Sequence, residues 1–92
     1  MSDSPGNPKT IDTLVISDDE ETPSLSDPTS GRLLITNQVG KRVIELSDGS
    51  RDVSRLTDHI FEEFEGATRD EIRRHILHFL NECVRKGLVV WV

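Results

Sequence analysis

The chain has 92 residues, 34% of them hydrophobic and 30% charged, so it can form no more than one small domain, which favours a binding module over a stand-alone enzyme. A single cysteine excludes an internal disulfide framework and a cysteine-based zinc site, and no apolar run is long enough to span a membrane. The net charge of −6 lies entirely in residues 1–30, where seven acids face one lysine, whereas residues 31–92 are neutral.

The first third of the chain begins with a segment that cannot form a core. Residues 1–10 (MSDSPGNPKT) are rich in Ser, Pro and Gly, which predicts a disordered tail. They lack the basic and apolar regions of a secretory signal, so we expect a cytoplasmic protein. An apolar run at 14–16 predicts a short strand, and residues 17–22 predict an acidic loop. A single domain is therefore expected over residues 11–92.

Turn residues follow this loop. Asp27-Pro28 and Ser30-Gly31 combine a residue with fixed φ and one that tolerates positive φ, and apolar residues lie on both sides. This pattern predicts a hairpin with strands near 23–27 and 31–36.

The apolar period then changes from two residues to about 3.6, which indicates helices. Asn37 can cap a first helix that ends at Ser47-Asp48-Gly49, where Gly49 suits a left-handed conformation. Asp52 or Ser54 begins a second helix, which stops at Gly66.

Thr68 and Glu71 form a capping box that opens a third helix over about 69–86, closed by Gly87. The β-prone run 88–92 follows. The predicted fold is α+β and winged helix-turn-helix-like, with a small antiparallel three-stranded sheet followed by three helices.

The third helix carries more apolar surface than a single core stripe needs. At 100° per residue, the predicted core stripe consists of Ile72, Ile76, Phe79 and Cys83. A second apolar arc beside it consists of Leu77, Leu80 and Val84, with Arg73 at its edge. Two interpretations stay open: the sheet covers this arc, or the arc forms a groove for a partner.

The second hairpin strand is the other candidate binding element. If it lies at the edge of the sheet, its free backbone groups can pair with a strand of another chain. The residues concerned are Arg32, Leu33, Leu34, Ile35 and Thr36.

The basic residues of the third helix suggest an alternative function, a winged-helix DNA-binding regulator. Acidic residues lie among them and cancel much of the positive field. The neutral domain and the acidic N-terminal third also argue against this alternative, because nucleic-acid binders usually carry a basic excess. We therefore expect no nucleic-acid partner.

Metal binding and catalysis have little support. His75 and His78 have the spacing of metal ligands, but no third ligand completes a site, so no metal is expected. Cys83 lies in the predicted core stripe, which indicates a buried residue and not a nucleophile. No glycine-rich phosphate loop is present.

The segment 14–21 (LVISDDEE) offers a third alternative. An apolar triplet followed by acids resembles a SUMO-interacting sequence, which would make the chain an interaction adaptor. The structural alternative, a first strand followed by an acidic loop, is the preferred interpretation.

Residues 29–92 resemble the PqqD family, in the order and spacing of several short motifs. These are Leu33 to Asn37, Gly40, Asp48-Gly49, Arg51 and Val53, Phe79-Leu80, and Gly87-Leu88. The family includes the peptide chaperone of pyrroloquinoline quinone biosynthesis. It also includes the recognition domains for ribosomally made, post-translationally modified peptides.

The resemblance implies a non-enzymatic peptide chaperone. In such domains the leader segment of a precursor peptide adds as a strand to the third strand, in the cleft beside the third helix. Carried over to this chain, the peptide-binding residues are Arg32, Leu33, Leu34, Ile35, Thr36, Arg73, Leu77, Leu80 and Val84.

The resemblance also implies a second partner, a modifying enzyme, typically a radical S-adenosylmethionine enzyme. An iron–sulfur cluster would belong to that enzyme, because this chain has one cysteine, and we expect no cofactor here. Free sheet edges leave both a monomer and a weak dimer open.

Overall fold

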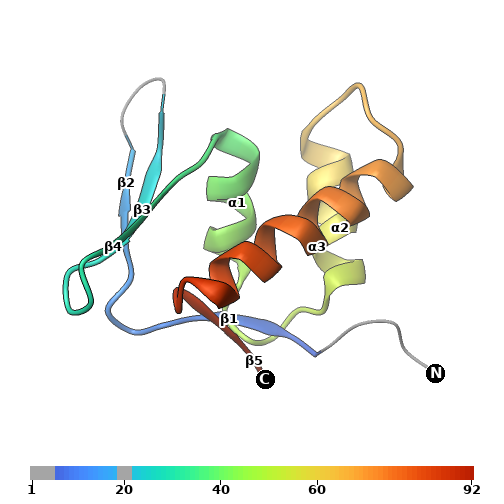
Figure 1. Ribbon diagram of the computed structural model, residues 1–92. Helices are drawn as coiled ribbons and strands as arrows, with labels where there is room; N and C mark the ends of the chain where they lie inside the picture. Colours follow the sequence, from blue (N-terminus) through green and yellow to red (C-terminus); the bar gives the residue numbers. More distant parts are fainter. Residues whose placement is uncertain (1–5, 19–21) are drawn as a thin grey trace.

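The computed structural model describes residues 6–18 and 22–92. A three-stranded sheet lies to one side of three helices, and a second, two-stranded sheet runs below them (Figure 1). In chain order the elements are β1 (Pro8–Thr10), β2 (Val15–Ser17), β3 (Ser24–Asp27), β4 (Arg32–Ile35), α1 (Gln38–Leu46), α2 (Val53–Glu63), α3 (Arg69–Arg85) and β5 (Val89–Trp91). Residues 1–5 of the predicted tail and 19–21 of the predicted acidic loop lie outside the described residues.

The larger sheet confirms the predicted hairpin and strand. Its order is β2-β3-β4, all antiparallel. Asp27 holds the turn between β3 and β4, since its carboxylate accepts from the Thr29 N–H at 3.0 Å and the Ser30 hydroxyl at 2.9 Å. Gly31 takes the positive φ of 73° that the turn requires. The α+β architecture is therefore confirmed.

The predicted helix N-caps are also confirmed, with Asp52 and not Ser54 at the start of α2. The side chains of Asn37, Asp52 and Thr68 accept a backbone N–H from the first turns of α1, α2 and α3, respectively. These contacts satisfy donors that have no partner within the helix, which is why the local sequence located the starts of the helices.

For residues 6–10, the described part of the predicted tail, the structure corrects the prediction of disorder. Pro8–Thr10 form β1, which pairs antiparallel with β5. Asn7 extends the ladder, because its N–H donates to the Val92 carbonyl at 2.8 Å and its carbonyl accepts the Val92 N–H at 2.7 Å. The segment is ordered by backbone bonds to the far end of the chain, and these leave no side-chain pattern in the sequence.

The core lies mainly among the three helices and β5, with Leu25 of β3 added from the larger sheet, and α3 is its central helix. The buried residues of α3 are Ile72, Ile76, Leu80 and Cys83. Leu80 is 0% exposed, so of the two interpretations of the second apolar arc the covered one holds for this residue, and it does not line an open groove. Phe79, predicted to be buried, is only partly so. The helical wheel gave the width of the apolar arc, but α1, α2 and β5, which pack against α3, decide which part of it is covered.

Candidate functional site

Strand β4 has an open edge. In the described part of the chain the order β2-β3-β4 gives β4 a hydrogen-bonded neighbour on one side only. The Thr36 N–H donates to the Pro23 carbonyl at 2.9 Å, and antiparallel pairing alternates between residues that face the partner strand and residues that face away. The N–H and C=O groups of Leu33 and Ile35 therefore point to the open edge, where another strand can pair with them.

A cleft opens where β4 passes into α1, and we call it the α1–α3 cleft. Its volume is about 470 Å³. It is lined by Thr36 directly after β4, the start of α1, the end of α2 with the loop that follows, and the first two thirds of α3. The lining residues are Thr36, Asn37, Val39, Gly40, Val43, Ile60, Phe64, Glu65, Ala67, Ile72, His75, Ile76, His78 and Phe79.

The lining of the α1–α3 cleft is mostly apolar. Valine, isoleucine and phenylalanine side chains from three helices contribute most of it, whereas Asn37, Glu65, His75 and His78 are exposed residues. Such a lining suits a large apolar side chain. Its exposed polar groups can orient the ligand that carries this side chain.

Gly40 shows how closely the elements approach at the cleft. A Cβ at this position would collide with the Thr36 hydroxyl and lie 3.2 Å from the Phe79 ring. Asn37 fixes the start of α1 here, because its side chain accepts the Gly40 N–H at 2.9 Å. Glycine is thus required for the end of β4, α1 and α3 to meet.

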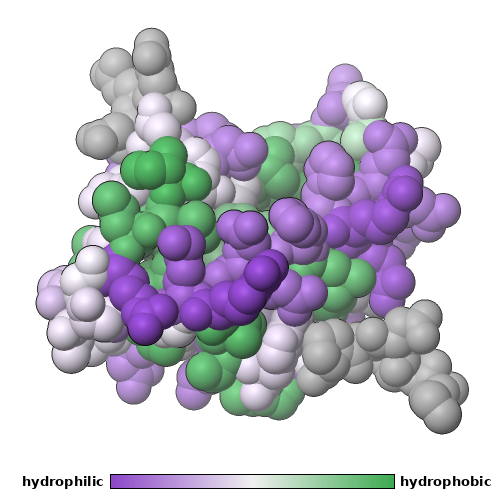
Figure 2. Space-filling model, viewed as in Figure 1, coloured by the Kyte–Doolittle hydropathy of each residue, from purple (hydrophilic) through white to green (hydrophobic). Residues whose placement is uncertain are grey.

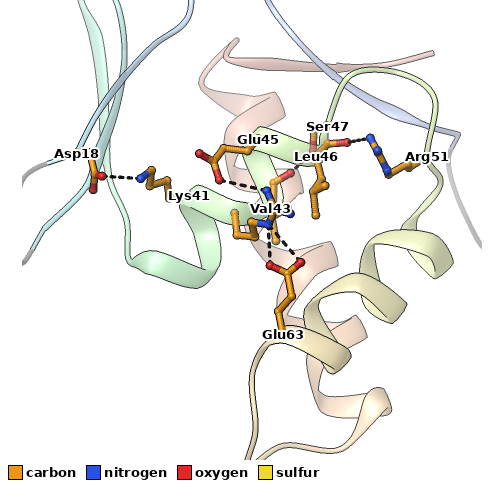
Figure 3. A network of polar contacts seen from close by, with 9 residues as sticks. Asp18, Lys41, Val43, Glu45, Leu46, Ser47, Arg51 and Glu63 are labelled. Atoms are coloured by element: carbon orange, nitrogen blue, oxygen red, sulfur yellow. Dashed lines mark hydrogen bonds and ion pairs between the residues drawn. The ribbon is translucent and has the colours of Figure 1, made fainter.

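Ion pairs hold α1 in place from two sides (Figure 3). Arg42 Nε lies 2.8 Å from Glu63 on α2, and this carboxylate raises the pKa of Arg42. Lys41 Nζ lies 2.7 Å from Asp18, and this contact lowers the pKa of the Asp18 carboxyl. None of these four residues lines the cleft, so they position α1 without contacting an occupant.

The strand half of the predicted site lies beside the cleft. Its first four residues, Arg32, Leu33, Leu34 and Ile35, form β4. Thr36 follows directly and lines the cleft. The structure therefore brings an open strand edge and an apolar cleft together.

The helix half of the predicted site lies elsewhere on α3. None of Arg73, Leu77, Leu80 and Val84 lines the cleft. Leu77 and Val84 are partly buried against the core. At 100° per residue they lie about 160° and about 140° around the helix from Phe79, which does line the cleft. They therefore cannot share its surface.

Sequence reasoning missed the residues of α1 and α3 that do line the cleft, above all Phe79 and His75. One signal pointed to them. Gly40 interrupts the apolar stripe of α1, and a glycine inside a helix often marks a close approach by another element.

The other candidate residues give no sign of catalysis. Cys83 is 0% exposed, and its burial raises the pKa of the thiol to about 12, so the thiol stays protonated at neutral pH. His75 and His78 lie at the cleft, but within residues 6–18 and 22–92 no group of three or more His, Cys, Asp or Glu could hold a metal ion.

Residues that suggested DNA binding or an interaction adaptor make contacts within the domain. On α3, Arg69 forms an ion pair with Asp58 and lies over the Phe61 ring. Val15–Ser17, within the segment 14–21, forms β2 and pairs with β3. The predicted loop at 17–22 thus begins inside a strand.

Comparison with known proteins identifies the family. The model of the family described as coenzyme PQQ synthesis protein D (PqqD) matches residues 24–89. The chain belongs to the PqqD family. The match runs from β3 to the start of β5, so it includes both the open edge and the cleft. No curated protein matches the sequence significantly.

Two solved structures share the PqqD-like fold of this chain. One is TbiB1 in complex with the TbiA(beta) leader peptide, with a TM-score of 0.73 and 22% identity, covering 88% of this chain and 93% of that one. The other is lasso peptide synthetase B1 complexed with the leader peptide, with a TM-score of 0.75 and 13% identity, covering 92% and 99%. In the described ranges of this PqqD-family chain, no helix is long and apolar enough to cross a membrane.

Proposed function

We propose that this protein binds the leader segment of a ribosomally made precursor peptide by strand addition to β4. One observation carries the proposal: the open edge of β4 leads directly into Thr36, the residue after the strand, which lines the α1–α3 cleft. A strand paired with β4 therefore places one of its side chains at the mouth of an apolar cleft. Family membership and the two leader-peptide complexes of similar fold support the proposal.

Two contributions to affinity follow from this geometry. Backbone groups of Leu33 and Ile35 would exchange hydrogen bonds with the peptide, independently of its sequence. A bulky apolar side chain in the cleft would add about 1.5–3 kcal/mol through burial, and this term selects the peptide. Neither contribution involves chemistry on the peptide, so the proposed role is recognition and not catalysis.

The proposed site keeps the five strand residues predicted from the sequence and changes the helix residues. On α3 we assign Ile72, His75, Ile76 and Phe79 in place of Arg73, Leu77, Leu80 and Val84. Asn37, the N-cap of α1, and Gly40 also line the cleft.

An amide NMR titration tests the site directly. The probe is a synthetic leader peptide encoded by the small open reading frame nearest to the gene, with a scrambled peptide and a short DNA duplex as controls. We expect shifts at residues 33–36 and 72–79 with the leader only. Shifts produced by the duplex, steeply reduced by salt, would instead support the DNA-binding alternative.

A matched pair of variants tests the assignment on α3. Phe79→Ala removes a ring from the cleft and should weaken leader binding by about tenfold or more, since burial of a large side chain contributes about 1.5–3 kcal/mol. Leu77→Ala lies on the opposite flank and should leave the dissociation constant unchanged. Isothermal titration calorimetry measures both, and the reverse result would favour the helix residues predicted from the sequence.

We also propose that the bound peptide is passed to a modifying enzyme, of the radical S-adenosylmethionine class that the family resemblance implies. One of the similar structures belongs to a lasso peptide synthetase, so the enzyme class needs its own test. The test is to co-express the tagged chain with the enzymes encoded beside it and to purify the complex through the tag. An iron–sulfur absorption band in the complex would support a radical enzyme, whereas a complex with an enzyme that holds no cluster would contradict this class.

A further inference from the structure

Two large apolar side chains stand exposed on the outer face of β4. Leu33 is 54% and Ile35 is 56% exposed, although both belong to a strand. Leu34 between them points the other way, since it pairs with Leu25, which is 0% exposed, and packs against the core. Figure 2 shows hydrophobic side chains gathered over this sheet, at the left of the molecule.

The sheet itself leaves these two side chains without an apolar neighbour on β3. The residues paired with Leu33 and Ile35 are Ser26 and Ser24, which are too small to cover them. The side that remains is the open edge, where an added strand would place its side chains about 4.5–5.5 Å from theirs. Both the exposed pair and the open edge thus belong to the same strand.

We propose that the peptide is recognised on both faces of β4, and that it carries two apolar residues, two positions apart, which pack against Leu33 and Ile35. This inference rests on the proposed function and specifies the class of peptide. Side chains alternate along a strand. The peptide residue that lies opposite Thr36 therefore enters the cleft, and the adjacent peptide residue packs beside Ile35 on the outer face. The next residue lies beside Leu34, and the one after it beside Leu33.

The peptide therefore contains a short run of consecutive apolar residues, with the bulkiest at the end that enters the cleft. β-branched side chains suit the two outward positions, because they pack well on a pleated surface. A peptide with apolar residues only at the positions that face the cleft and Leu34 makes no apolar contact with Leu33 and Ile35 on the outer face.

Peptide selection tests the proposal and does not require the precursor to be identified. The probe is an mRNA-displayed library of random 12-residue peptides, selected on the full chain and on the variant Leu33→Thr/Ile35→Thr. Threonine is β-branched, as Ile35 is, and therefore suits a strand at both positions, and it removes most of the apolar surface of both side chains. We expect the wild type to select an apolar pair spaced i, i+2 in addition to a bulky residue. The variant should keep the bulky residue and lose the preference for the pair.

Calorimetry on one selected peptide gives the magnitude. The double variant should bind about 2- to 30-fold more weakly, because two cross-strand pairs are lost. The matched control is Val15→Thr on the same face, at a residue that is 44% exposed. It pairs with Ser26 on the far side of β3, about three strand spacings from the added strand, and should change nothing.

The alternative outcomes separate this inference from the proposed function. If wild type and double variant select the same peptides with equal affinity, and amide shifts still map to residues 33–36, the inference is overturned and strand addition stands. If the selected peptides shift residues away from β4 and the cleft, both are wrong. If the wild type sediments as a dimer and the double variant as a monomer without a change in peptide affinity, the outer face binds a second copy, which also overturns the inference.

Discussion

Gly40 shows that a single missing side chain can determine the shape of the site. It lies in a buried turn of α1, against the Thr36 hydroxyl and the Phe79 ring. A methyl group there has no free space, so the residues at the end of β4 and on α3 would have to move. The cleft thus depends on the absence of a Cβ as much as on the apolar side chains around it.

Gly40→Ala should therefore lower the free energy of unfolding, by about 1–3 kcal/mol for an overpacked site. Urea denaturation measures the loss. Thr36→Ala removes the hydroxyl that the new methyl meets, so the double variant should recover part of the loss. A loss that is simply the sum of the two single variants would contradict the steric explanation.

Cys83 is a core residue whose thiol responds to alkaline pH. Its pKa rises from the ordinary value of 9.0 to about 12 in the folded chain because it is buried. Between these pH values the unfolded chain has lost the thiol proton while the folded chain keeps it. The contribution of this residue to stability is therefore complete below about pH 9 and declines toward about pH 12.

The free energy of unfolding should fall as the pH rises from about 9 to about 12, and Cys83→Ala should flatten that slope. Denaturant titrations at a series of pH values measure it. At about pH 8 a thiol reagent should label the unfolded chain at once and the folded chain slowly. Fast labelling of the folded chain would show that the thiol is accessible.

At the scale of the element, β4 and the residue after it combine three roles. Leu34 anchors the strand in the core, the backbone of Leu33 and Ile35 faces the open edge, and Thr36 leads into the cleft. This division follows from the two-residue period of a strand, because neighbouring residues face opposite sides.

Ile35→Pro removes an N–H that points to the open edge and should leave the pairing with β3 intact. Peptide affinity should fall by up to about tenfold more than in Ile35→Thr, which loses a similar side chain but keeps the N–H. Calorimetry measures both, with circular dichroism to check the fold. Equal affinities would show that this N–H makes no bond to the peptide.

At the scale of the whole molecule, the second sheet joins the two ends of the described chain. β1 pairs with β5, and its residues also bond to the loop after α1: the Thr10 N–H donates to the Ser47 carbonyl at 3.0 Å, and the Gly49 N–H to the Pro8 carbonyl at 2.9 Å. The N-terminal segment thus bonds to two parts of the domain, β5 and the loop after α1, and none of its described residues lines the cleft.

Deletion of residues 1–10 should lower the free energy of unfolding by about 2 kcal/mol, since several backbone bonds are lost and some chain entropy is regained. The α1–α3 cleft should survive, so peptide affinity at low temperature should be unchanged. Deletion of residues 1–5 keeps β1 and serves as the control. An equal loss in the two deletions would show that β1 does not stabilise the domain.

The sequence by itself determined the features that depend on residues close together in the chain. Asn37 and Thr68 located helix starts, Asp27 and Gly31 located the turn, and the apolar period separated strands from helices. Each of these signals is a contact within a few residues, so its physical cause is contained in a short window. The family resemblance, carried by such local motifs, led from these elements to the correct family.

Only the tertiary structure decided the pairing of β1 with β5 and the flank of α3 that lines the cleft. The first depends on backbone bonds between the ends of the described chain. The second depends on the directions from which α1, α2 and β5 pack, which buried Leu80 and left Phe79 at the cleft. An apolar arc in the sequence shows that a helix face is covered or bound, and packing alone determines which part of it remains open.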